Sequence, residues 1–550
     1  MNLRSRLRIS RDKSVTVANL VEKLLLQNGD YEAGVENDGT PWRLSTLQTK
    51  ISAIDVFLRQ SVALRPGQAV AIYRTNDRRC FHWFLGIVRA GGIAVPLNPQ
   101  LSLAEVRRIL ATSGTEILVT DRATFARTIQ ARGALNVQTW IQAEDDPSTE
   151  TLDGFIRPVL DPTGPSFPPV VLDPSATVAV FHTSGTSGFP KGAALSSRAL
   201  LGARSSTVLA GLVLSRKDLA LIALPWSHIM AVGIALYGLM AGLRGCVLEK
   251  FDVPRVLEIV ERLKVTTVVG VPAMFARLVN SHPDPARLAS VRVWLSASDH
   301  LPADVRNRLR QYGALLRLPR GRRVPPVILN GYGMVELGGL AMMGVDFSFA
   351  PGSGDLCFPV PPFKIRVTAE DGRPAPAGTP GECQIRRRGI APHYWKDEAN
   401  ASTNGHSPHM ALLTPDGWLR TGDLATRNRL GLIRLVGRSK DVIKSGGYSV
   451  YVRELDEALT SHPAVACAAA FGLPHPEKGE VPVAAVELHN GSSATESDLL
   501  DFCRLNLAAY KSPRRIWIVA PGTLPQNHTG KLLRRTLQER FSAETLGQPL

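Results

Sequence analysis

The sequence has 550 residues, of which 44% are hydrophobic and 20% are charged. This length exceeds one ordinary hydrophobic core and this composition is typical of folded globular proteins, so the chain is not disordered and should form two or more domains. The formal net charge of +16 would suit nucleic acid, a membrane surface or anionic small substrates as partners. No basic helix with interleaved aromatic residues supports the first of these, so we expect no nucleic-acid binding.

The cysteines and the N-terminal arm indicate the compartment in which the protein acts. The six cysteines are widely scattered and include no C-x-x-C pair, which argues against a disulfide framework and a zinc site and favours a reducing, cytoplasmic compartment. The N-terminal arm is densely basic and no apolar core of a signal peptide follows it. We expect it to be a disordered tail with at most peripheral contact to anionic lipid. Its basic residues are Arg4, Arg6, Arg8, Arg11 and Lys13.

The first part of the chain alternates short apolar runs with amphipathic stretches. This alternation predicts strands and helices in turn, and therefore a parallel sheet covered by helices. Residues 144–169 are rich in Asp, Pro, Ser and Thr and predict a connecting loop. The predicted strands are 69–73, 93–97 and 117–120, and the predicted helices are 81–90 and 103–111.

The stretch at 181–192 reads F-H-T-S-G-T-S-G-F-P-K-G. It follows an apolar, β-branched run and precedes a helix-compatible run at 196–213, so it predicts a loop between a strand and a helix. Glycines let the backbone approach a phosphate, hydroxyls donate hydrogen bonds and Lys191 supplies positive charge. Pro190 before Lys191 and Gly192 after it exclude a Walker-type loop. Taken alone, the stretch could equally be a surface turn.

The next stretch, 219–243, is apolar and about long enough to span a bilayer. Pro225, the Ser227–His228 pair and three glycines interrupt it, so a buried strand at 221–224 and a buried helix at 230–240 explain it better. Strands and helices continue to alternate after it. Predicted helices cover 253–263 and 273–280, and predicted strands cover 266–271, 291–296 and 327–329.

Beyond residue 363 the pattern becomes β-rich and antiparallel, with Pro and Gly turns. A charged stretch at 437–441 then separates this segment from a compact α+β unit. We therefore predict an α/β fold with a large N-terminal domain over 1–436, a hinge at 437–440 and a small mobile domain over 441–550. The large domain should hold parallel-type sheets with helices and a β-rich subdomain.

Four further motifs accompany the loop at 181–192. They are N-G-Y-G-M-V-E at 330–336, T-G-D at 421–423, G-R-S-K-D-V-I-K-S-G-G at 437–447 and T-G-K at 529–531. In order and spacing the five motifs resemble the adenylate-forming superfamily of acyl-CoA synthetases, non-ribosomal adenylation domains and beetle luciferases. The resemblance covers nearly the whole chain. It implies that a carboxylate attacks the α-phosphate of ATP to give an acyl adenylate and pyrophosphate, after which a thiol takes the acyl group.

The resemblance implies a phosphate and metal site. Lys191 would anchor the loop or its phosphates, and Glu336 would help to hold Mg²⁺, a hard cation that prefers oxygen, with Thr186 as a second contact. The loop residues that would wrap the β- and γ-phosphates are Thr183, Ser184, Gly185, Thr186, Ser187 and Gly188.

The rest of the nucleotide site follows from the same resemblance. Tyr332 would lie against the adenine, and Asn330 and Gly333 complete its motif. Asp423 would accept hydrogen bonds from both ribose hydroxyls, with Arg438 as a nearby donor.

Three elements of the small domain would serve the reaction in turn. Lys531 would bridge the attacking carboxylate and the nucleotide and stabilise moving charge. Lys440 would be the hinge about which the small domain rotates. The loop with Lys444, Gly446 and Gly447 would then enter, because glycine lets pantetheine pass close to the backbone.

The acid-binding pocket is less defined by sequence. His228 matches a position that flanks the acyl pocket in many relatives, although a buried structural histidine is nearly as good an interpretation. Gly233, Val271 and Ser296 should line the same cleft. Because no residue there calls for a second charge on the substrate, a largely apolar acid, fatty or aromatic, fits best.

Val335 departs from the family pattern, which usually has Thr before the glutamate. The threonine hydroxyl would donate toward the nucleotide phosphate, and losing this charge-assisted hydrogen bond would cost ~1.5–3 kcal/mol of stabilisation. We therefore keep two alternatives to an acyl-CoA synthetase: a ligase that loads a carrier-protein pantetheine, and a catalytically weak adenylate-binding homologue. The intact stretch at 444–447 favours coenzyme A as the acceptor.

Overall fold

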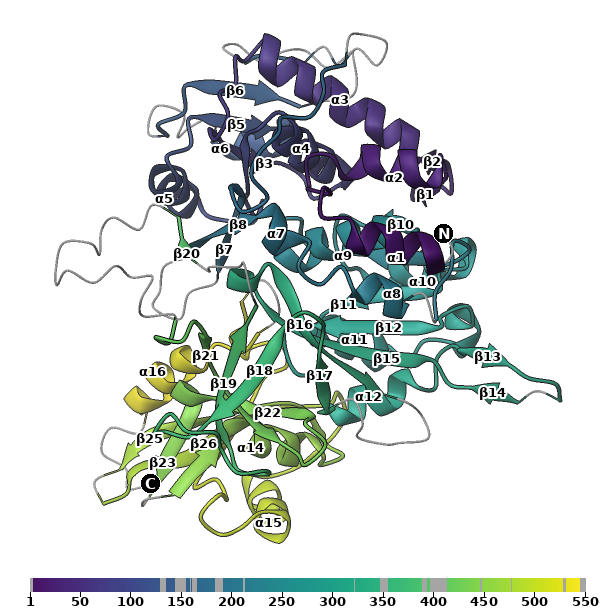
Figure 1. The fold of residues 1–550 in the computed structure, drawn as a ribbon. Helices are drawn as coiled ribbons and strands as arrows, with labels where there is room; N and C mark the ends of the chain where they lie inside the picture. Colours follow the sequence, from purple (N-terminus) through teal and green to yellow (C-terminus); the bar gives the residue numbers. More distant parts are fainter. Residues whose placement is uncertain are drawn as a thin grey trace.

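The computed structural model describes residues 3–128, 135–143, 155–158, 160, 166–183, 191–210, 213–320, 322–346, 355–387, 393–395, 413–445, 448–475, 477–527 and 531–544. Over these residues it contains a 13-stranded, a seven-stranded and a five-stranded sheet, together with one two-stranded ribbon (Figure 1). No helix in these ranges combines the length and the apolar character needed to cross a bilayer. The predicted α/β fold class is confirmed.

The seven-stranded sheet has the predicted alternation of strands and helices. Its strand order is β20-β8-β7-β4-β3-β5-β6, and β3 pairs in parallel with both β4 and β5. Every residue of β3 is buried, which is the pattern of a parallel sheet covered on both faces. Helices begin at local caps: Asp77 accepts from Arg79 N before α4, and Ser102 and Glu105 form a capping box at α5.

The elements of this region have the following bounds: α2 Leu20–Asn28, α3 Leu44–Gln60, β3 Ala69–Tyr73, α4 Arg78–Arg89, β4 Ile93–Pro96, α5 Leu103–Ser113, β5 Ile117–Thr120, α6 Arg122–Thr128, β6 Thr139–Gln142, β7 Thr177–Thr183, β8 Lys191–Ser196 and β20 His393–Tyr394.

The 13-stranded sheet is mixed. Its order is β18-β19-β21-β22-β17-β16-β15-β12-β11-β9-β10-β1-β2. The strands from β15 to β1 are parallel, and from β15 onward to β18 the neighbours pair antiparallel. The predicted β-rich segment therefore continues the large sheet through β16 and β17.

Its elements are β1 Glu32–Val35, β2 Pro41–Arg43, β9 Leu219–Ile222, α9 Ile229–Ala241, β10 Arg244–Val247, α10 Val253–Leu263, β11 Thr267–Gly270, α11 Pro272–Asn280, β12 Val293–Ala297, α12 Ala303–Leu309, β15 Val327–Met334, β16 Gly339–Asp346, β17 Cys357–Pro359, β18 Lys364–Thr368, β19 Gly381–Arg386, β21 Leu419–Arg427 and β22 Ile433–Arg438. The apolar stretch at 219–243 forms β9 and the buried helix α9, as predicted.

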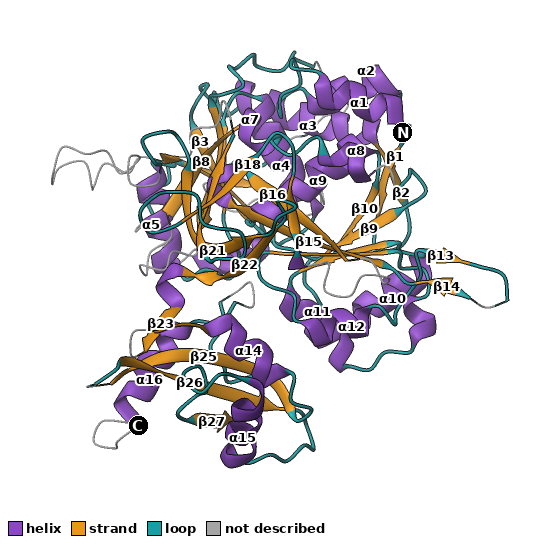
Figure 2. Ribbon diagram, turned by 60° about the horizontal axis from the view of Figure 1, so that its bottom comes forward, coloured by secondary structure: helices purple, strands orange, loops and turns teal. Residues whose placement is uncertain are grey.

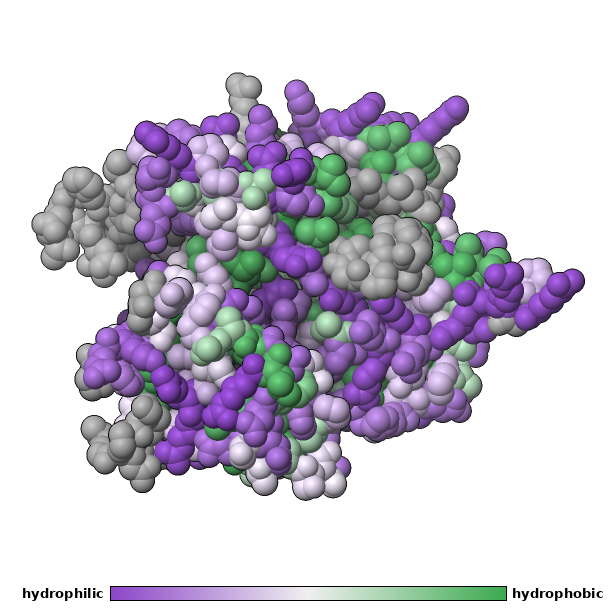
Figure 3. Space-filling view, turned by 90° about the horizontal axis from the view of Figure 1, so that it is seen from below, coloured by the Kyte–Doolittle hydropathy of each residue, from purple (hydrophilic) through white to green (hydrophobic). Residues whose placement is uncertain are grey.

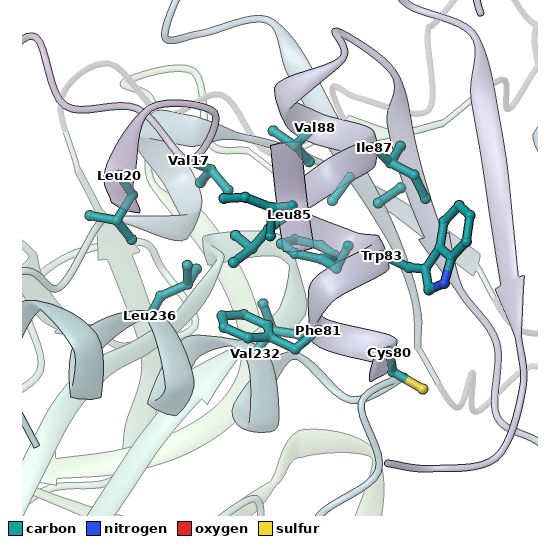
Figure 4. Close-up of a cluster of buried hydrophobic side chains, with 14 of the residues drawn as sticks. Val17, Leu20, Cys80, Phe81, Trp83, Leu85, Ile87, Val88, Val232 and Leu236 are labelled. Carbon is teal, nitrogen blue, oxygen red and sulfur yellow. The ribbon is translucent and has the colours of Figure 1, made fainter. Parts of the chain in front are cut away.

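A shared apolar core joins the two large sheets. In Figure 4, Phe81 and Leu85 of α4 point toward Val232 and Leu236 of α9, and Val17 lies beside them. Each of these side chains is nearly fully buried, and burial of such a side chain stabilises a fold by about 1.5–3 kcal/mol. The two sheets are therefore held as one body through helix packing.

The N-terminal arm differs from its prediction. Residues Leu3–Arg11 form helix α1. The prediction of a disordered tail is therefore wrong for these residues. Arg6 is 1% exposed and donates from Nη2 to Leu214 O at 3.0 Å, while Ile9 is fully buried. Arg6 and Ile9 lie three positions apart, on one face of the helix, and this face packs on the body.

The segment after the loop at 181–192 also differs from its prediction. Instead of one helix over 196–213, the chain forms β8, which pairs antiparallel with β7 from Thr177↔Ser196 to Thr183↔Lys191. The buried run at 193–195 satisfies its backbone groups in the sheet. Helices follow only as short pieces, α7 Ser197–Leu200 and α8 Ser206–Ala210. The loop is thus the tip of a β-hairpin.

The C-terminal part is a compact α+β unit with its own core. Phe471, Trp517 and Phe541 stack on one another, with centroid distances of 4.4–6.2 Å. Figure 2 shows this unit set apart from the large sheets and joined to them near β23. The chain leaves the 13-stranded sheet after Arg438 and enters the five-stranded sheet at Val442.

Its elements are β23 Val442–Ser445, β24 Tyr448–Tyr451, α14 Val452–Thr460, β25 Val465–His475, β26 Gly479–Leu488, α15 Glu496–Asn506, β27 Ile516–Val519 and α16 Arg534–Glu544.

Candidate active site

One large cavity, about 2670 Å³ in volume, extends between the helices and the 13-stranded sheet and opens toward the C-terminal unit. Residues from both large sheets and from the C-terminal unit line it. Most of the site residues singled out in the sequence are among them: Lys191, His228, Gly233, Val271, Asn330, Tyr332, Gly333, Val335, Glu336, Asp423, Arg438, Lys440 and Lys531.

The motif at 330–336 occupies the end of β15 and the turn that follows. Strand β15 pairs in parallel with β12 and antiparallel with β16, and its register shifts between Tyr332 and Gly333. A Cβ on Gly333 would meet Gly339 O at 2.0 Å, so only glycine fits at this position. The close approach lets the chain turn at Val335 into a short 3₁₀ helix and presents Glu336 to the cavity.

Tyr332, Asp423 and Arg438 form a hydrogen-bonded group across three strands. The Tyr332 hydroxyl donates to Asp423 Oδ2 at 2.5 Å, and Arg438 Nε lies 3.2 Å from Asp423 Oδ1. Asp423 and Arg438 are register partners on β21 and β22. Burial, reinforced by the charge of Asp423, raises the pKa of Tyr332 well above its usual value, so the hydroxyl stays protonated and donating. The carboxylate is thereby fixed in orientation and retains lone pairs for further donors.

A second group joins Glu336 to the base of the hairpin. Tyr394 Oη donates to Glu336 Oε1 at 3.0 Å, and Lys191 Nζ lies 5.1 Å from the centroid of the Tyr394 ring. Tyr394 reaches this position because β20 pairs with β8, with Tyr394 opposite Ala193. No sequence motif singles out Tyr394, which lies 58 positions from Glu336.

The tip of the hairpin, with Ser184, Gly185, Thr186, Ser187 and Gly188, lies outside the described residues. Its two ends are fixed by the pair Thr183↔Lys191. A Cβ on Gly192 would meet Val180 Cγ1 at 2.8 Å, so a glycine is needed beside the packed His182 ring. Burial lowers the pKa of His182 to about 4. The neutral, packed base holds the start and end of the loop in register.

Lys531 reaches this site from the C-terminal unit. It lines the cavity, and burial lowers its pKa. The negative charge of Asp299 opposes this shift, and the positive charge of Arg438 reinforces it. Lys440 lies between β22 and β23, and burial together with the charges of Arg438 and Lys531 lowers its pKa as well. Three cations therefore converge near Asp423, which makes this end of the cavity suited to an anionic ligand.

Contacts between the large sheets and α14 hold the C-terminal unit in this orientation. His300 Nε2 lies 2.9 Å from Glu457 Oε1, and Arg453 Nη2 lies 3.9 Å from Asp355 Oδ1. Hydrogen bonds from His300, with the positive charge of Arg453, lower the pKa of Glu457 to about 2. These residues carry no motif that sequence analysis could detect.

Of the residues expected to meet pantetheine, the structure describes only Lys444. Lys444 is exposed, donates from Nζ to Ser449 Oγ at 2.9 Å and is not among the described residues that line the cavity. Gly446 and Gly447 lie outside the described residues. In this orientation, Lys531 faces the cavity and Lys444 does not.

The wall of the cavity formed by α9, β11 and β12 is largely apolar. His228 caps α9, its Nδ1 accepting from Met230 N at 3.2 Å, while Gly233 and Val271 line the wall. Ser296 is fully buried on β12, and within the described chain the lining includes its neighbours Leu295 and Ala297 but not Ser296. Alternation along the strand places Ser296 on the opposite face.

Comparisons with known proteins agree with this geometry. The family model described as "AMP-binding enzyme" matches residues 23–395, and "AMP-binding enzyme C-terminal domain" matches residues 454–531. A feruloyl-CoA synthase of Amycolatopsis is 30% identical, covering 93% of this chain and 96% of that protein, and a long-chain-fatty-acid–CoA ligase of Yersinia pestis is 27% identical, covering 96% and 95%.

A solved structure, ATP-bound MatB from Rhodopseudomonas palustris, has the same fold. Its TM-score is 0.79 at 24% identity, covering 96% of this chain and 99% of that chain. The family models together span both the large sheets and the C-terminal unit. The chain therefore belongs to the AMP-binding enzyme family, within the adenylate-forming superfamily that its motifs resemble.

Proposed function

We propose that this acid–thiol ligase uses ATP to convert a largely apolar carboxylic acid into an acyl adenylate, and then transfers the acyl group to coenzyme A. The observation that supports this best is the Tyr332–Asp423–Arg438 group. It forms a fixed polar site in the cavity whose α9, β11 and β12 wall is largely apolar, and Lys531 lines the same cavity.

The nucleotide would bind with its ribose at Asp423. Tyr332 and Arg438 already hold that carboxylate, so its remaining lone pairs can accept from the ribose hydroxyls without reorganisation. Asn330 and Gly333 line the same wall. The phosphates would then extend toward the hairpin tip, with Thr183 and Lys191 at its two ends and Ser184, Gly185, Thr186, Ser187 and Gly188 between them.

The residues present fit a role for Mg²⁺ carried by the nucleotide. Glu336 is 8% exposed, lines the cavity and keeps one oxygen beyond its bond from Tyr394. Within the described chain, no group of three or more metal-ligating side chains occurs. One carboxylate plus substrate phosphates is how proteins usually hold this ion. Glu336, with Thr186 as a second contact, would hold Mg²⁺, which neutralises phosphate charge when bound.

Lys531 would act on the first half-reaction. The carboxylate of the acid and the α-phosphate both carry negative charge, and their approach costs energy unless a cation lies between them. Lys531 lies near Asp423 and Arg438, at the end of the cavity where the apolar and polar regions meet. It would orient the carboxylate for in-line attack and stabilise charge as pyrophosphate leaves.

The acid would lie along the face of the 13-stranded sheet. On β11, β12 and β15, alternate residues face the cavity and none of them is charged. Four residues of β11 give a wall of ~13 Å, long enough for an aryl or an extended aliphatic chain. Gly233 of α9 leaves space opposite, since a Cβ there would meet nothing nearer than 3.8 Å. The facing residues are Thr267, Val269, Val293, Leu295, Ala297, Val327, Leu329 and Gly331.

The second half-reaction would need the C-terminal unit to rotate about Lys440. Rotation would withdraw Lys531 and bring Lys444, Gly446 and Gly447 to the cavity. The short 3₁₀ segment Ser439–Asp441, between two sheets with separate cores, is the place where backbone change costs least. His300–Glu457 and Arg453–Asp355 would have to separate during this step.

The test is pyrophosphate release with a panel of aliphatic and aryl acids, each with and without coenzyme A. We expect release with one class of apolar acid, and a thioester product only when coenzyme A is present. Adenylate formation without thioester would instead favour a carrier-protein pantetheine as acceptor. No release with any acid would favour an adenylate-binding homologue that is catalytically weak because of Val335.

A further inference from the structure

A two-stranded antiparallel ribbon projects from the large part of the molecule. Strand β13 (Leu316–Arg317) pairs with β14 (Arg323–Val324) through Leu316↔Val324 and Arg317↔Arg323. The bond from Leu318 N to Arg322 O, 2.8 Å long, extends the pairing toward the tip. Figure 1 and Figure 2 both show the ribbon standing away from the body. None of its described residues lines the cavity, so the proposed reaction does not explain it.

The ribbon has two unlike faces, because successive side chains of a strand point to opposite sides. Leu316 and Leu318 share one face with Val324, and Arg317 and Arg323 share the other. Leu316 is 54% exposed and Leu318 is 44% exposed. Two adjacent leucines on a projecting ribbon expose apolar surface that a purely structural hairpin would be expected to bury or replace with polar residues.

The arginine face holds the ribbon to the body. Arg323 Nη1 donates to Gln311 O at 2.8 Å and to Gly313 O at 2.7 Å, and Arg317 Nη2 donates to Ala289 O at 3.0 Å. These bonds fix the base of the ribbon. The leucine face is thus presented to the outside in a fixed orientation and does not collapse onto the domain.

The tip of the ribbon is strongly basic. Residues 313–326 contain four arginines and no acidic residue. Arg320 and Arg322 are exposed on either side of the turn, next to Leu318. Figure 3 shows the ribbon as a hydrophilic spur on the right of the molecule. Apolar and cationic side chains therefore lie close together along the ribbon.

This combination matches the interface of a lipid bilayer better than it matches nucleic acid. Leucines can enter the boundary between headgroups and acyl chains, while arginines keep their guanidinium groups at the phosphates. A nucleic-acid surface would use the arginines but leave the leucines exposed, and residues 313–326 contain no aromatic side chain on which a base could stack.

We propose that the β13–β14 ribbon docks the protein onto bilayers that contain anionic lipid, with Leu316 and Leu318 inserted and Arg320 and Arg322 on the headgroup phosphates. The net charge of +16 would add long-range attraction to the same surface. Docking would be peripheral and reversible, and would bring the enzyme to a phase in which apolar acids concentrate.

Flotation of the full-length protein with vesicles tests this proposal. The vesicles are phosphatidylcholine alone or phosphatidylcholine mixed with phosphatidylglycerol, each at low and high salt. We expect binding to the anionic vesicles at low salt. Arg320→Glu with Arg322→Glu should weaken this binding on the order of thirtyfold, since each basic residue near an anionic surface contributes ~1 kcal/mol. Leu316→Ser with Leu318→Ser should weaken it about tenfold or more at either salt concentration.

A matched control lies at the turn between β21 and β22, where Arg429, Arg434 and Leu430 are also exposed. Arg429→Glu with Arg434→Glu, and Leu430→Ser, should leave vesicle binding within about twofold. Pyrophosphate release with a water-soluble acid should be unchanged in every variant. Binding that is equal in the ribbon and control variants would overturn the proposal. So would binding to RNA or DNA that depends on the arginines but not on the leucines.

Discussion

The Tyr332 hydroxyl donates to Asp423 Oδ2 across 2.5 Å, and this contact joins the end of β15 to β21 in the same sheet. The two residues lie 91 positions apart in the sequence. Burial and the neighbouring carboxylate raise the pKa of Tyr332 well above its usual value, so the hydroxyl keeps its proton and can donate. Tyr332 therefore positions the carboxylate that is proposed to bind the ribose.

Tyr332→Phe should weaken ATP binding while leaving the ring in place. A hydrogen bond to a charged group contributes ~1.5–3 kcal/mol, so we expect KM for ATP to rise about tenfold to a hundredfold, with a smaller change for the acid. Steady-state pyrophosphate release measures both constants. Tyr31→Phe is the control, because it removes a buried hydroxyl that donates to Leu239 O at 2.8 Å, and Tyr31 is not among the described residues that line the cavity. An unchanged KM for ATP in Tyr332→Phe would contradict the assignment of Asp423 to the ribose.

Val335→Thr should raise the rate of adenylate formation. Val335 lines the cavity and is only partly buried against the apolar core, so a hydroxyl of nearly the same volume can be accommodated and can donate toward the nucleotide. If it acts in the transition state, ~1.5–3 kcal/mol corresponds to roughly tenfold to over a hundredfold in rate. Rapid-quench measurement of the acyl adenylate tests this. Val335→Ala, which adds no donor, separates the hydroxyl from a simple size effect, and equal rates in Val335→Thr and the unaltered protein would show that another donor compensates.

His182 should make the protein sensitive to mild acid. Its pKa is about 4 in the folded state, below the ordinary value of 6.5, because burial disfavours the charged ring. The unfolded chain therefore binds the extra proton first, and stability falls as pH drops from about 6.5 toward 4. At pH 5 the loss should be on the order of 2 kcal/mol. Thermal unfolding at pH 5 and pH 7.5 should show a smaller pH effect in His182→Gln than in the unaltered protein.

Much of this architecture could be predicted from local sequence patterns. The strand at 69–73 and the helix at 253–263 match β3 and α10 residue for residue, because apolar periodicity and end caps act within a few residues. The motif residues also gather as expected, since Tyr332, Asp423 and Arg438 lie on strands that the topology brings together.

The rest depended on contacts that are distant in the sequence. Strand β8 forms because its residues pair with β7. The stabilisation from this pairing cannot be detected from the helical periodicity of the sequence. Helix α1 is ordered because Arg6 finds Leu214 O, 208 positions away. Tyr394 and His300 reach the site through pairings that no motif marks. Local reasoning fails where a buried polar group is satisfied by a distant partner.

Gly447→Leu should separate the two half-reactions. A leucine side chain would fill the channel proposed for pantetheine, whereas adenylate formation is proposed to depend on Lys531 and residues of the large sheets. We expect pyrophosphate release in the first turnover to stay within about twofold and thioester formation to fall by on the order of a hundredfold or more. Gly491→Leu, at an exposed turn glycine of the same unit with φ of 78°, controls for general effects of such a change on the small unit. Equal loss of both steps in Gly447→Leu would contradict the proposed role.

Glu457→Gln should shift the balance between the two orientations of the C-terminal unit. Its carboxylate lies 2.9 Å from His300 Nε2 and 2.8 Å from Arg453 Nε, but its side chain is 45% exposed. Exposed ion pairs contribute ~0.2–1 kcal/mol. We therefore expect the equilibrium between the two orientations to change about twofold to fivefold, without an abrupt loss of activity. Because the pKa of Glu457 is about 2, below its unfolded value, the stabilisation contributed by its ionised carboxylate is fully present above about pH 4.5 and is lost as pH falls toward 2.

The separate rates of the two half-reactions in Glu457→Gln show in which direction the balance of orientations changes. Loosening the contact should slow adenylate formation and leave transfer to coenzyme A from preformed acyl adenylate unchanged or faster, because only the first step is proposed to use the present orientation. Asp416→Asn is the matched control, since it breaks the Arg366–Asp416 pair, 2.6 Å long, within the β-rich part of the large sheet. It should affect neither step. If Glu457→Gln slowed both half-reactions to the same extent, the contact between α14 and His300 would serve stability alone, and the rotation of the C-terminal unit would have to be limited by other contacts.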